Sequence, residues 1–397
     1  MVRTFIFSML APGLLLAADF NGNWDGFVVT NAARIPFRME VSGPPARVCF
    51  FEDAEPICST SVQVAGDSLV AQWDYLNSRL TLTAAAGVLS GTYVNLRTQR
   101  QIQIEAGPHQ HSAAPSQPPA NFAGEWEVHS VERPGPGNQL ILRQSGTELK
   151  GTILRIDGDE GTLVGRVDGN QFAIAHFSGD RPAMLKGTLQ ADGSLALESG
   201  AQKLIALHPA DARARNFAPP LDPMTYAHPK TPGEKFHFSF KDVDGKPYTE
   251  DSFAGKPYVV SITGSWCPNC RDEAPFLVEL YRRYHSHGLE MAAFCFESAG
   301  DPTFAPLRAF VRRFHVEYPV LLAGELSEGV LKTAVPQIEN LTAYPTTIYV
   351  GRDGTVRSVH TGFPSGGSGE ELARVKEEIG ATIERLIAEK PAGKAAR

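Results

Sequence analysis

The sequence predicts a multidomain protein in which two small antiparallel β units, each a meander or barrel-like sheet, precede an α/β domain. Three observations lead to this prediction. A divergent repeat occupies the first half of the chain, short alternating segments follow each copy of it, and strands alternate with helices from about Phe236 onward. At 397 residues the chain is long enough for two or three domains.

The repeat is the basis for predicting two β units. Asp19–Trp24 reads DFNGNW, and Asn121–Trp126 reads NFAGEW about one hundred residues later. Short segments that alternate polar and apolar residues follow each copy, separated by Gly-Asp, Asp-Gly and Gly-Asn pairs that favour hairpin turns. We therefore expect two related sheets, with Trp24 and Trp126 as core residues rather than ligand contacts.

Composition predicts where the domains meet. One stretch is rich in Pro, Ser and Ala and a second is rich in Pro, as is typical of linkers. His109 and His111 lie in the first stretch and are interpreted as solvated linker residues rather than metal ligands. The predicted boundaries are β domains at 19–105 and 121–208, linkers at 106–120 and 209–231, and the α/β domain at 232–390.

The N-terminal residues 1–18 have the pattern of a secretory signal peptide. A basic residue precedes an apolar stretch from Phe5 to Leu16, and two alanines precede Asp19. The apolar stretch is short for a membrane span, and a Pro-Gly pair interrupts it. The pattern favours export to the periplasm or cell envelope, with tethering by an uncleaved N-terminal segment as the alternative.

Cysteine usage agrees with an exported protein, and the net charge bears on nucleic-acid binding. Cys49 and Cys58 lie nine positions apart and could form a disulfide across a hairpin in an oxidising compartment, a pair of buried free thiols being the alternative. The apolar content of 42% and charged content of 20% are typical of a soluble globular protein. A net charge of −7 without a polybasic patch gives no support to nucleic-acid binding.

The residues with the clearest chemistry lie in the α/β domain, in the sequence WCPNCR at 266–271. The pair Cys267 and Cys270 follows an apolar run that predicts a buried strand and precedes a segment with helical periodicity. At a helix N-terminus, unpaired N–H groups and the helix dipole favour an anion. They should therefore favour the reactive thiolate of Cys267, which indicates thiol–disulfide exchange.

A zinc site is the alternative interpretation of this cysteine pair. Structural zinc usually needs four ligands, as two such pairs or one pair with two histidines. The remaining cysteines, Cys49, Cys58 and Cys295, form no second pair of this spacing, and His285 and His287 lack the usual finger spacing. The pattern therefore favours redox chemistry and predicts no metal.

The α/β domain has a predicted order of elements. The candidate strands are 258–263, 289–296, 318–322, 346–350 and 356–361, and the candidate helices lie near 268–287, 303–315, 325–334 and 369–389.

Four motifs follow one another within residues 232–390. They are FSFKDVDGKPY, YVVSITGSWCPNC, RDEAP and AYPTTIYVGRDGTVRSVHTGF. In this combination the domain resembles a TlpA-like thiol:disulfide oxidoreductase of the thioredoxin superfamily, and the resemblance implies a thioredoxin-like fold. Nothing comparable identifies the N-terminal β region, so its role stays open.

The resemblance implies a role for each matching residue. Cys267 would be the attacking thiol and Cys270 the resolving thiol. Tyr344 and Pro345 match the family's cis-proline loop, which packs beside the disulfide and receives the substrate backbone. Trp266 and Pro268 flank the attacking thiol and are assigned with that loop to substrate binding.

Glu273 matches an active-site glutamate found in part of the family. On a helix, three residues after Cys270 is a neighbouring position on one face. A buried carboxylate there could exchange a proton with the thiol, whereas an exposed one would be an ordinary helix carboxylate. Ser261 stands where thioredoxins carry a buried aspartate, which makes Glu273 the leading candidate for proton handling.

Together these features predict an exported enzyme that reduces protein disulfides through a mixed disulfide, without metal, nucleotide or flavin. The family usually obtains electrons from a membrane thiol transporter, and some members reduce apocytochrome c. The sequence does not set the direction, and the reverse reaction would make an oxidase.

Two other functions are considered. A peroxidase of the peroxiredoxin type would carry PxxxTxxC, but neither Cys267 nor Cys270 has Thr and Pro at those spacings. Alternatively, the β domains would recruit a ligand or envelope partner.

Overall fold

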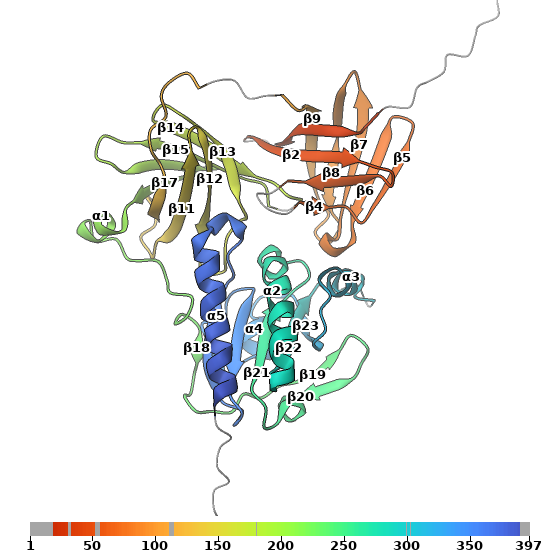
Figure 1. The fold of residues 1–397 in the computed structure, drawn as a ribbon, viewed down its shortest axis with the longest axis vertical. Helices are drawn as coiled ribbons and strands as arrows, with labels where there is room; N and C mark the ends of the chain where they lie inside the picture. The colour runs from red at the N-terminus through yellow and green to blue at the C-terminus, as the bar shows by residue number, and fades with distance from the viewer. Residues whose placement is uncertain are drawn as a thin grey trace, which may run out of the picture.

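The computed structural model describes residues 19–30, 33–51, 56–110, 115–179, 181–298, 300–301 and 303–389. The predicted signal peptide and His111 lie outside these ranges. Two β units lie side by side above an α/β domain, so that the fold is multidomain as the sequence predicts (Figure 1). Within the described ranges, no helix combines the length and apolar character needed to cross a membrane.

The first β unit is a nine-stranded antiparallel sheet in the order β4-β3-β2-β1-β9-β8-β7-β6-β5. Alternate side chains face its core, where Phe50 stacks on Trp73 with ring centroids 5.0 Å apart. Its elements are β1 (Gly22–Val29), β2 (Arg34–Ser42), β3 (Arg47–Phe50), β4 (Ile57–Cys58), β5 (Ser61–Ala65), β6 (Ser68–Trp73), the 3₁₀ turn η1 (Asp74–Leu76), β7 (Ser78–Ala85), β8 (Val88–Asn95) and β9 (Arg100–Pro108).

A disulfide joins two neighbouring strands of this sheet. Cys49 of β3 lies opposite Cys58 of β4 in the antiparallel register, and their sulfur atoms are bonded. The pair thus staples a hairpin and is not a pair of free thiols.

The second β unit is a closed antiparallel barrel, in which β10 pairs with β17. Closure leaves no sheet edge exposed, and the interior is filled by apolar side chains such as Phe122, Trp126 and Leu140. Its strands are β10 (Gly124–Ser130), β11 (Asn138–Ser145), β12 (Glu148–Leu154), β13 (Leu163–Asp168), β14 (Gln171–His176), β15 (Ala183–Leu189), β16 (Leu195–Ser199) and β17 (Gln202–Leu207).

The sequence repeat is also a structural repeat. The indole Nε1 of Trp24 donates to the carbonyl oxygen of Phe20 at 3.0 Å, and Trp126 donates to Phe122 at 3.1 Å. Both tryptophans are buried, as expected for core residues. The glycine two residues before each tryptophan has a positive φ, which explains why glycine occurs in both copies.

The α/β domain is built on a seven-stranded sheet in the order β20-β19-β23-β22-β21-β25-β26, with β21, β22 and β23 parallel. The elements that precede the cysteine pair are the short helix α1 (Pro209–Ala214), β18 (His228–Pro229), β19 (Ser239–Asp242), β20 (Pro247–Thr249), η2 (Glu250–Phe253) and β21 (Tyr258–Thr263). Those that follow are α2 (Pro268–Tyr284), η3 (His285–His287), β22 (Glu290–Glu297), α3 (Ala305–Phe314), β23 (Val320–Glu325), α4 (Val330–Ala334), β24 (Ile338–Glu339), β25 (Thr346–Val350), β26 (Val356–Thr361), η4 (Gly366–Ser368) and α5 (Glu370–Ala388).

Alternation along β21 assigns side chains to the two faces of this sheet. Val260 and Ile262 pack in the core that includes Phe294 and Leu331, whereas Val259 packs with α2, α3 and α5. Ser261 and Thr263 share the face of Val259. They therefore point toward α2, the helix that carries the cysteine pair.

Some predicted boundaries differ from the structure. Strand β9 continues to Pro108, so the linker does not begin at Ala106, which is buried and pairs with Gly26 and Leu89. His109 is exposed, as predicted, and its ring also contacts Asp25 at 2.8 Å. The proline-rich stretch at 209–231 contains α1 and β18, and β18 pairs with β24 of the α/β domain.

Within the α/β domain the predicted elements are found, three of them with the predicted bounds: β21, β25 and β26. The predicted helix at 325–334 is only α4, because β23 extends to Glu325 and Gly329 takes a positive φ just before the helix. The short pairs β19–β20 and β18–β24 were not predicted.

Candidate active site

The two cysteines lie where β21 ends and α2 begins. Cys267 is the N-cap of α2, and its sulfur accepts the backbone N–H of Cys270 at 3.3 Å. Both are free thiols and both side chains are buried. The strand-to-helix placement predicted from the sequence is therefore the observed one.

The loop before β25 lies against the first cysteine. The Tyr344–Pro345 peptide bond is cis, and the Cys267 thiol donates to the carbonyl oxygen of Tyr344 at 3.5 Å. The Tyr344 ring packs edge-on against Trp266, with centroids 5.1 Å apart. The structure thus brings Trp266 and Cys267 against the loop that contains Tyr344 and Pro345, which comes much later in the sequence.

Glu273 is buried beneath the cysteines rather than exposed on the helix. Its carboxylate accepts hydrogen bonds from the hydroxyls of Ser261 at 3.0 Å and Thr347 at 2.8 Å. Burial raises the pKa of Glu273 to about 7, and the two hydroxyls only partly offset this effect. A carboxyl with this pKa can take up and release a proton near neutral pH.

Cys270 is the more shielded thiol. Burial raises its pKa well above the ordinary value, with further contributions from Cys267 and from the charge of Glu273. Cys270 and Glu273 line one small cavity of about 10 Å³, together with Thr263 and Cys295. Cys270 therefore needs a base in order to react. The Glu273 carboxylate, which lines the same cavity, is the candidate for that base.

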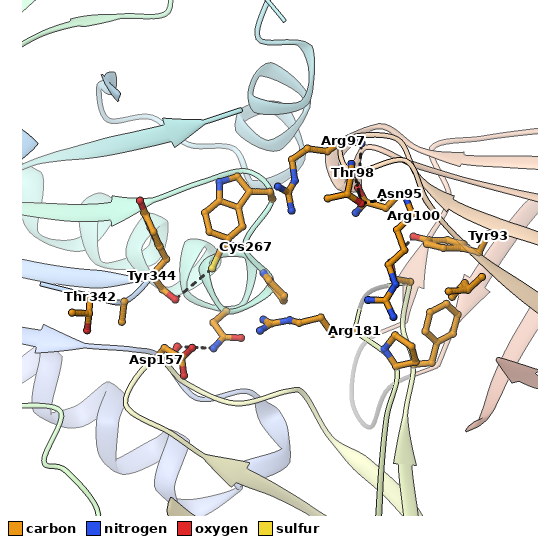
Figure 2. A pocket seen from close by; sticks show the side chains of 18 residues that line it. Tyr93, Asn95, Arg97, Thr98, Arg100, Asp157, Arg181, Cys267, Thr342 and Tyr344 are labelled. Carbon is orange, nitrogen blue, oxygen red and sulfur yellow. Dashed lines mark hydrogen bonds between the residues drawn. The ribbon is translucent and has the colours of Figure 1, made fainter. Parts of the chain in front are cut away.

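A larger cavity opens in front of Cys267, and all three domains form its walls. Its volume is about 380 Å³. Figure 2 shows Cys267 and Tyr344 on one side, and Tyr93, Arg97 and Arg100 of the first β unit on the other. The barrel closes the remaining side with Asp157, Phe177 and Arg181. Pro268 also lines the cavity, beside Cys267.

Specific contacts fix the barrel at this position. The Asn269 side chain donates to the backbone oxygen of Asp157 at 2.7 Å, and a side chain at Gly158 would overlap Asn269. Ser365 donates from its N–H and its hydroxyl to the Asp159 carboxylate at 2.9 and 3.0 Å. The β units are therefore part of the wall of this site.

Sequence reasoning missed the cavity residues of the β units. Arg97 belongs to the turn between β8 and β9, Arg100 is the first residue of β9, and Arg181 follows β14. Asn95 stabilises that turn by accepting from the N–H groups of Arg97 and Thr98, a pattern a sequence can suggest. Which surface the turn meets depends on domain packing, for which the sequence gives no signal.

No group of three or more His, Cys, Asp and Glu side chains could hold a metal ion in the part of the chain that the structure describes. The loose HxH of His285 and His287 lies at the far end of α2 from the cysteines.

Comparison with known proteins shows to which family the C-terminal part of the chain is related. Residues 231–377 match the Redoxin family model, so this part is a Redoxin domain with a thioredoxin-like fold. The chain is also similar in sequence to individual thiol-disulfide oxidoreductases and thioredoxin-like proteins. The ResA thiol-disulfide oxidoreductase of Bacillus thuringiensis subsp. konkukian is 29% identical over 122 residues, which is 30% of this chain and 63% of that protein. The thioredoxin-like protein YneN of Bacillus subtilis is 26% identical over 125 residues, 32% of this chain and 68% of that protein.

A putative thiol:disulfide interchange protein DsbE from Chlorobium tepidum covers 40% of this chain and 99% of its own, at 18% identity and a TM-score of 0.32. The chain spans under two thirds of the length of the ResA relative. The predicted TlpA-like resemblance is confirmed, and it covers the C-terminal part only.

Proposed function

We propose that this chain is an exported thiol–disulfide oxidoreductase that reduces disulfides with the Cys267–Cys270 dithiol. One observation carries the proposal. The Cys267 thiol lies against the cis Tyr344–Pro345 loop, while the second thiol and the raised-pKa carboxyl of Glu273 lie behind it. A nucleophile, a resolving thiol and a proton acceptor therefore occur in the order that exchange requires. The names of the ResA relatives agree with this class of activity.

The first step forms a mixed disulfide. The Cys267 thiolate attacks one sulfur of the substrate disulfide, an S–S bond forms between them, and the other substrate sulfur leaves as a thiolate. The N-terminal end of α2 stabilises the attacking anion, and the N–H of Cys270 donates directly to this sulfur. The Tyr344–Pro345 loop and Trp266 hold the substrate beside it.

The second step releases the product. Cys270 transfers its proton to Glu273 and attacks the Cys267 sulfur, so that the Cys267–Cys270 disulfide forms and the second substrate thiolate leaves. The substrate gains two electrons and the protein dithiol loses them. Because burial raises the pKa of Cys270, this step depends on the carboxylate. The mechanism calls for no metal, nucleotide or flavin.

Export and the return of electrons complete the proposal. The signal-like residues 1–18 and the Cys49–Cys58 disulfide both favour an oxidising compartment outside the cytoplasm, the periplasm or cell envelope. Regeneration of the dithiol there needs a thiol donor, and the TlpA-like resemblance suggests a membrane thiol-transporting protein.

Trapping the mixed disulfide tests this function. Reduced Cys270→Ser protein, mixed with 2-hydroxyethyl disulfide, should retain one hydroxyethylthio group on Cys267 in the intact mass spectrum, because no resolving thiol removes it. Cys267→Ser should retain none. Absence of an adduct from Cys270→Ser would refute the assignment of Cys267.

The role of Glu273 has a separate kinetic test. In Glu273→Gln the resolving step should slow by about a hundredfold, the lower range of general acid–base catalysis. In the unchanged protein this rate should rise with pH through about 7, as Glu273 loses its own proton, and the variant should lack that rise. Rapid-mixing measurement of mixed-disulfide decay provides both profiles, and identical profiles would exclude Glu273 as the proton acceptor.

A further inference from the structure

The cavity in front of Cys267 has the dimensions of a small-ligand site. Its volume of about 380 Å³ lies within the range of pockets that enclose small molecules. Cys267 is only 3% exposed, and the turn between β8 and β9 lies across the cavity from it. A disulfide on the surface of a folded protein would have to displace this turn, whereas a small disulfide would not.

The walls contributed by the β units are basic. Figure 2 shows the guanidinium groups of Arg97, Arg100 and Arg181 pointing into the space before Cys267. Asp157 is the one acidic residue in the described lining, and its backbone oxygen already contacts Asn269. With three guanidinium groups and one carboxylate, the described part of the lining has an excess of positive charge.

Two of these arginines have no carboxylate partner within the described ranges. The Arg97 guanidinium lies over the Trp266 ring, 5.4 Å from its centroid, next to the reactive cysteine. Burial raises the pKa of Glu297 and the Arg97 charge lowers it in part, but the two oxygens of that carboxylate accept hydrogen bonds from the N–H and hydroxyl of Ser265. Arg100 makes no ion pair there either. Both charges are available to a ligand, and guanidinium forms its strongest hydrogen bonds with carboxylate or phosphate.

We propose that this cavity selects small disulfides bearing carboxylate groups, with Arg97 and Arg100 as the residues that determine specificity. The inference rests on the proposed function, because it names the substrate class of the same dithiol. Arg97 and Arg100 bind the carboxylates while the Cys267 thiolate attacks the disulfide. The first thiolate product then leaves, and attack by Cys270 releases the second, so two electrons pass from the protein dithiol to one small disulfide.

The test uses three small disulfides of similar size and different charge: 3,3′-dithiodipropionate, 2-hydroxyethyl disulfide and cystamine. Fully reduced full-length protein is mixed with each, and each rate is divided by the rate with dithiothreitol, which removes differences in intrinsic reactivity. We expect a normalised preference for dithiodipropionate over cystamine of about tenfold at low salt, which falls as salt screens the charges.

Substitution identifies the residues responsible. In the Arg97→Gln, Arg100→Gln double variant this preference should fall toward one. Arg79→Gln provides the matched control, because Arg79 is an exposed arginine of the same β unit outside the cavity, and it should keep the preference. Equal thermal unfolding midpoints would show that all variants are folded.

Other outcomes distinguish failure of the proposed substrate class from failure of the proposed oxidoreductase function. If all three disulfides react but without a charge preference, or the double variant keeps the preference, the substrate class is wrong and the oxidoreductase function stands. Faster reduction of a disulfide-bonded protein such as insulin than of any small disulfide would also overturn the substrate class. If no disulfide is reduced, the proposed function itself fails.

Discussion

At the scale of single residues, Glu273 is the position where sequence and structure agree most closely. Its spacing from Cys270 predicts a shared helix face, and the structure places it in the core with two hydroxyl donors. Ser261 is one of these donors, so its hydroxyl helps to position the Glu273 carboxylate. The sequence could not show this contact, because it depends on the packing of β21 against α2.

The raised pKa of Glu273 has a consequence for stability. Its ordinary value is 4.5 and the folded value is about 7, so between these pH values the folded protein holds a proton that the unfolded chain has released. The free energy of unfolding should therefore fall by about 3 kcal/mol as pH rises from 4.5 to 7, and then level off.

Comparison with Glu273→Gln isolates this effect from other titrating groups. Glutamine has no proton to lose, so the variant should not show this loss of stability. Relative to the unchanged protein, the variant should therefore gain about 3 kcal/mol in free energy of unfolding as pH rises over this range. Denaturant unfolding at several pH values measures it. If the free energies of unfolding of the two proteins change in parallel from pH 4.5 to 8, folding does not raise the pKa of Glu273.

At the scale of elements, the order of strands and helices in the α/β domain could be predicted, because alternation and helical periodicity are local signals. The short pairs β18–β24 and β19–β20 escaped prediction since two to four residues show no period. The end of β9 was misplaced because Ala106 to Pro108 have linker composition, yet pairing with β1 and β8 keeps Ala106 in the core.

The repeated tryptophans make an element-scale prediction. In each β unit the indole N–H satisfies a buried carbonyl oxygen that precedes the first strand. Trp24→Phe and Trp126→Phe should each lower the free energy of unfolding by about 1–3 kcal/mol, because the carbonyl loses its partner and the smaller ring leaves space.

Chemical denaturation of both variants, followed by far-ultraviolet circular dichroism, measures these losses. Similar losses in the two units are expected from the repeated geometry. If either variant unfolds at the unchanged midpoint, the tryptophan hydrogen bond does not anchor that sheet.

At the scale of the whole molecule, the β units form part of the wall of the candidate active site. The sequence alone leaves open that they recruit a separate partner. Their arginines in the cavity support a direct part in substrate selection. Deletion of residues 19–210 would distinguish the roles, because a recruitment module can be lost without loss of activity on a generic small disulfide.

The contact between Asp159 and Ser365 should control how firmly the barrel is held. Asp159 is buried, and its carboxylate accepts hydrogen bonds from the N–H and hydroxyl of Ser365 and from the N–H of Gly161. In Asp159→Asn, the side-chain NH₂ group would face an N–H or hydroxyl that now donates to the carboxylate. Loss of that hydrogen bond should weaken the interface by about 1–3 kcal/mol. We expect faster proteolysis in the connection at 209–231 and a larger radius of gyration in X-ray scattering.

Asp157→Asn is the matched control for that variant. Asp157 contacts the α/β domain through its backbone oxygen, so the substitution leaves this hydrogen bond in place. Equal proteolysis of the two variants would mean that the Asp159 carboxylate does not hold the barrel.

The reduction potential of the Cys267–Cys270 pair tests the central claim most directly. The potential is obtained by thiol quantitation in dithiothreitol and glutathione buffers, with Cys267→Ser as the control. We expect a two-electron couple near that of thioredoxin, roughly −270 mV, as a reductase requires. A value near −120 mV would instead mark an oxidant and reverse the direction, and a pair that cycles in neither buffer would contradict the redox function.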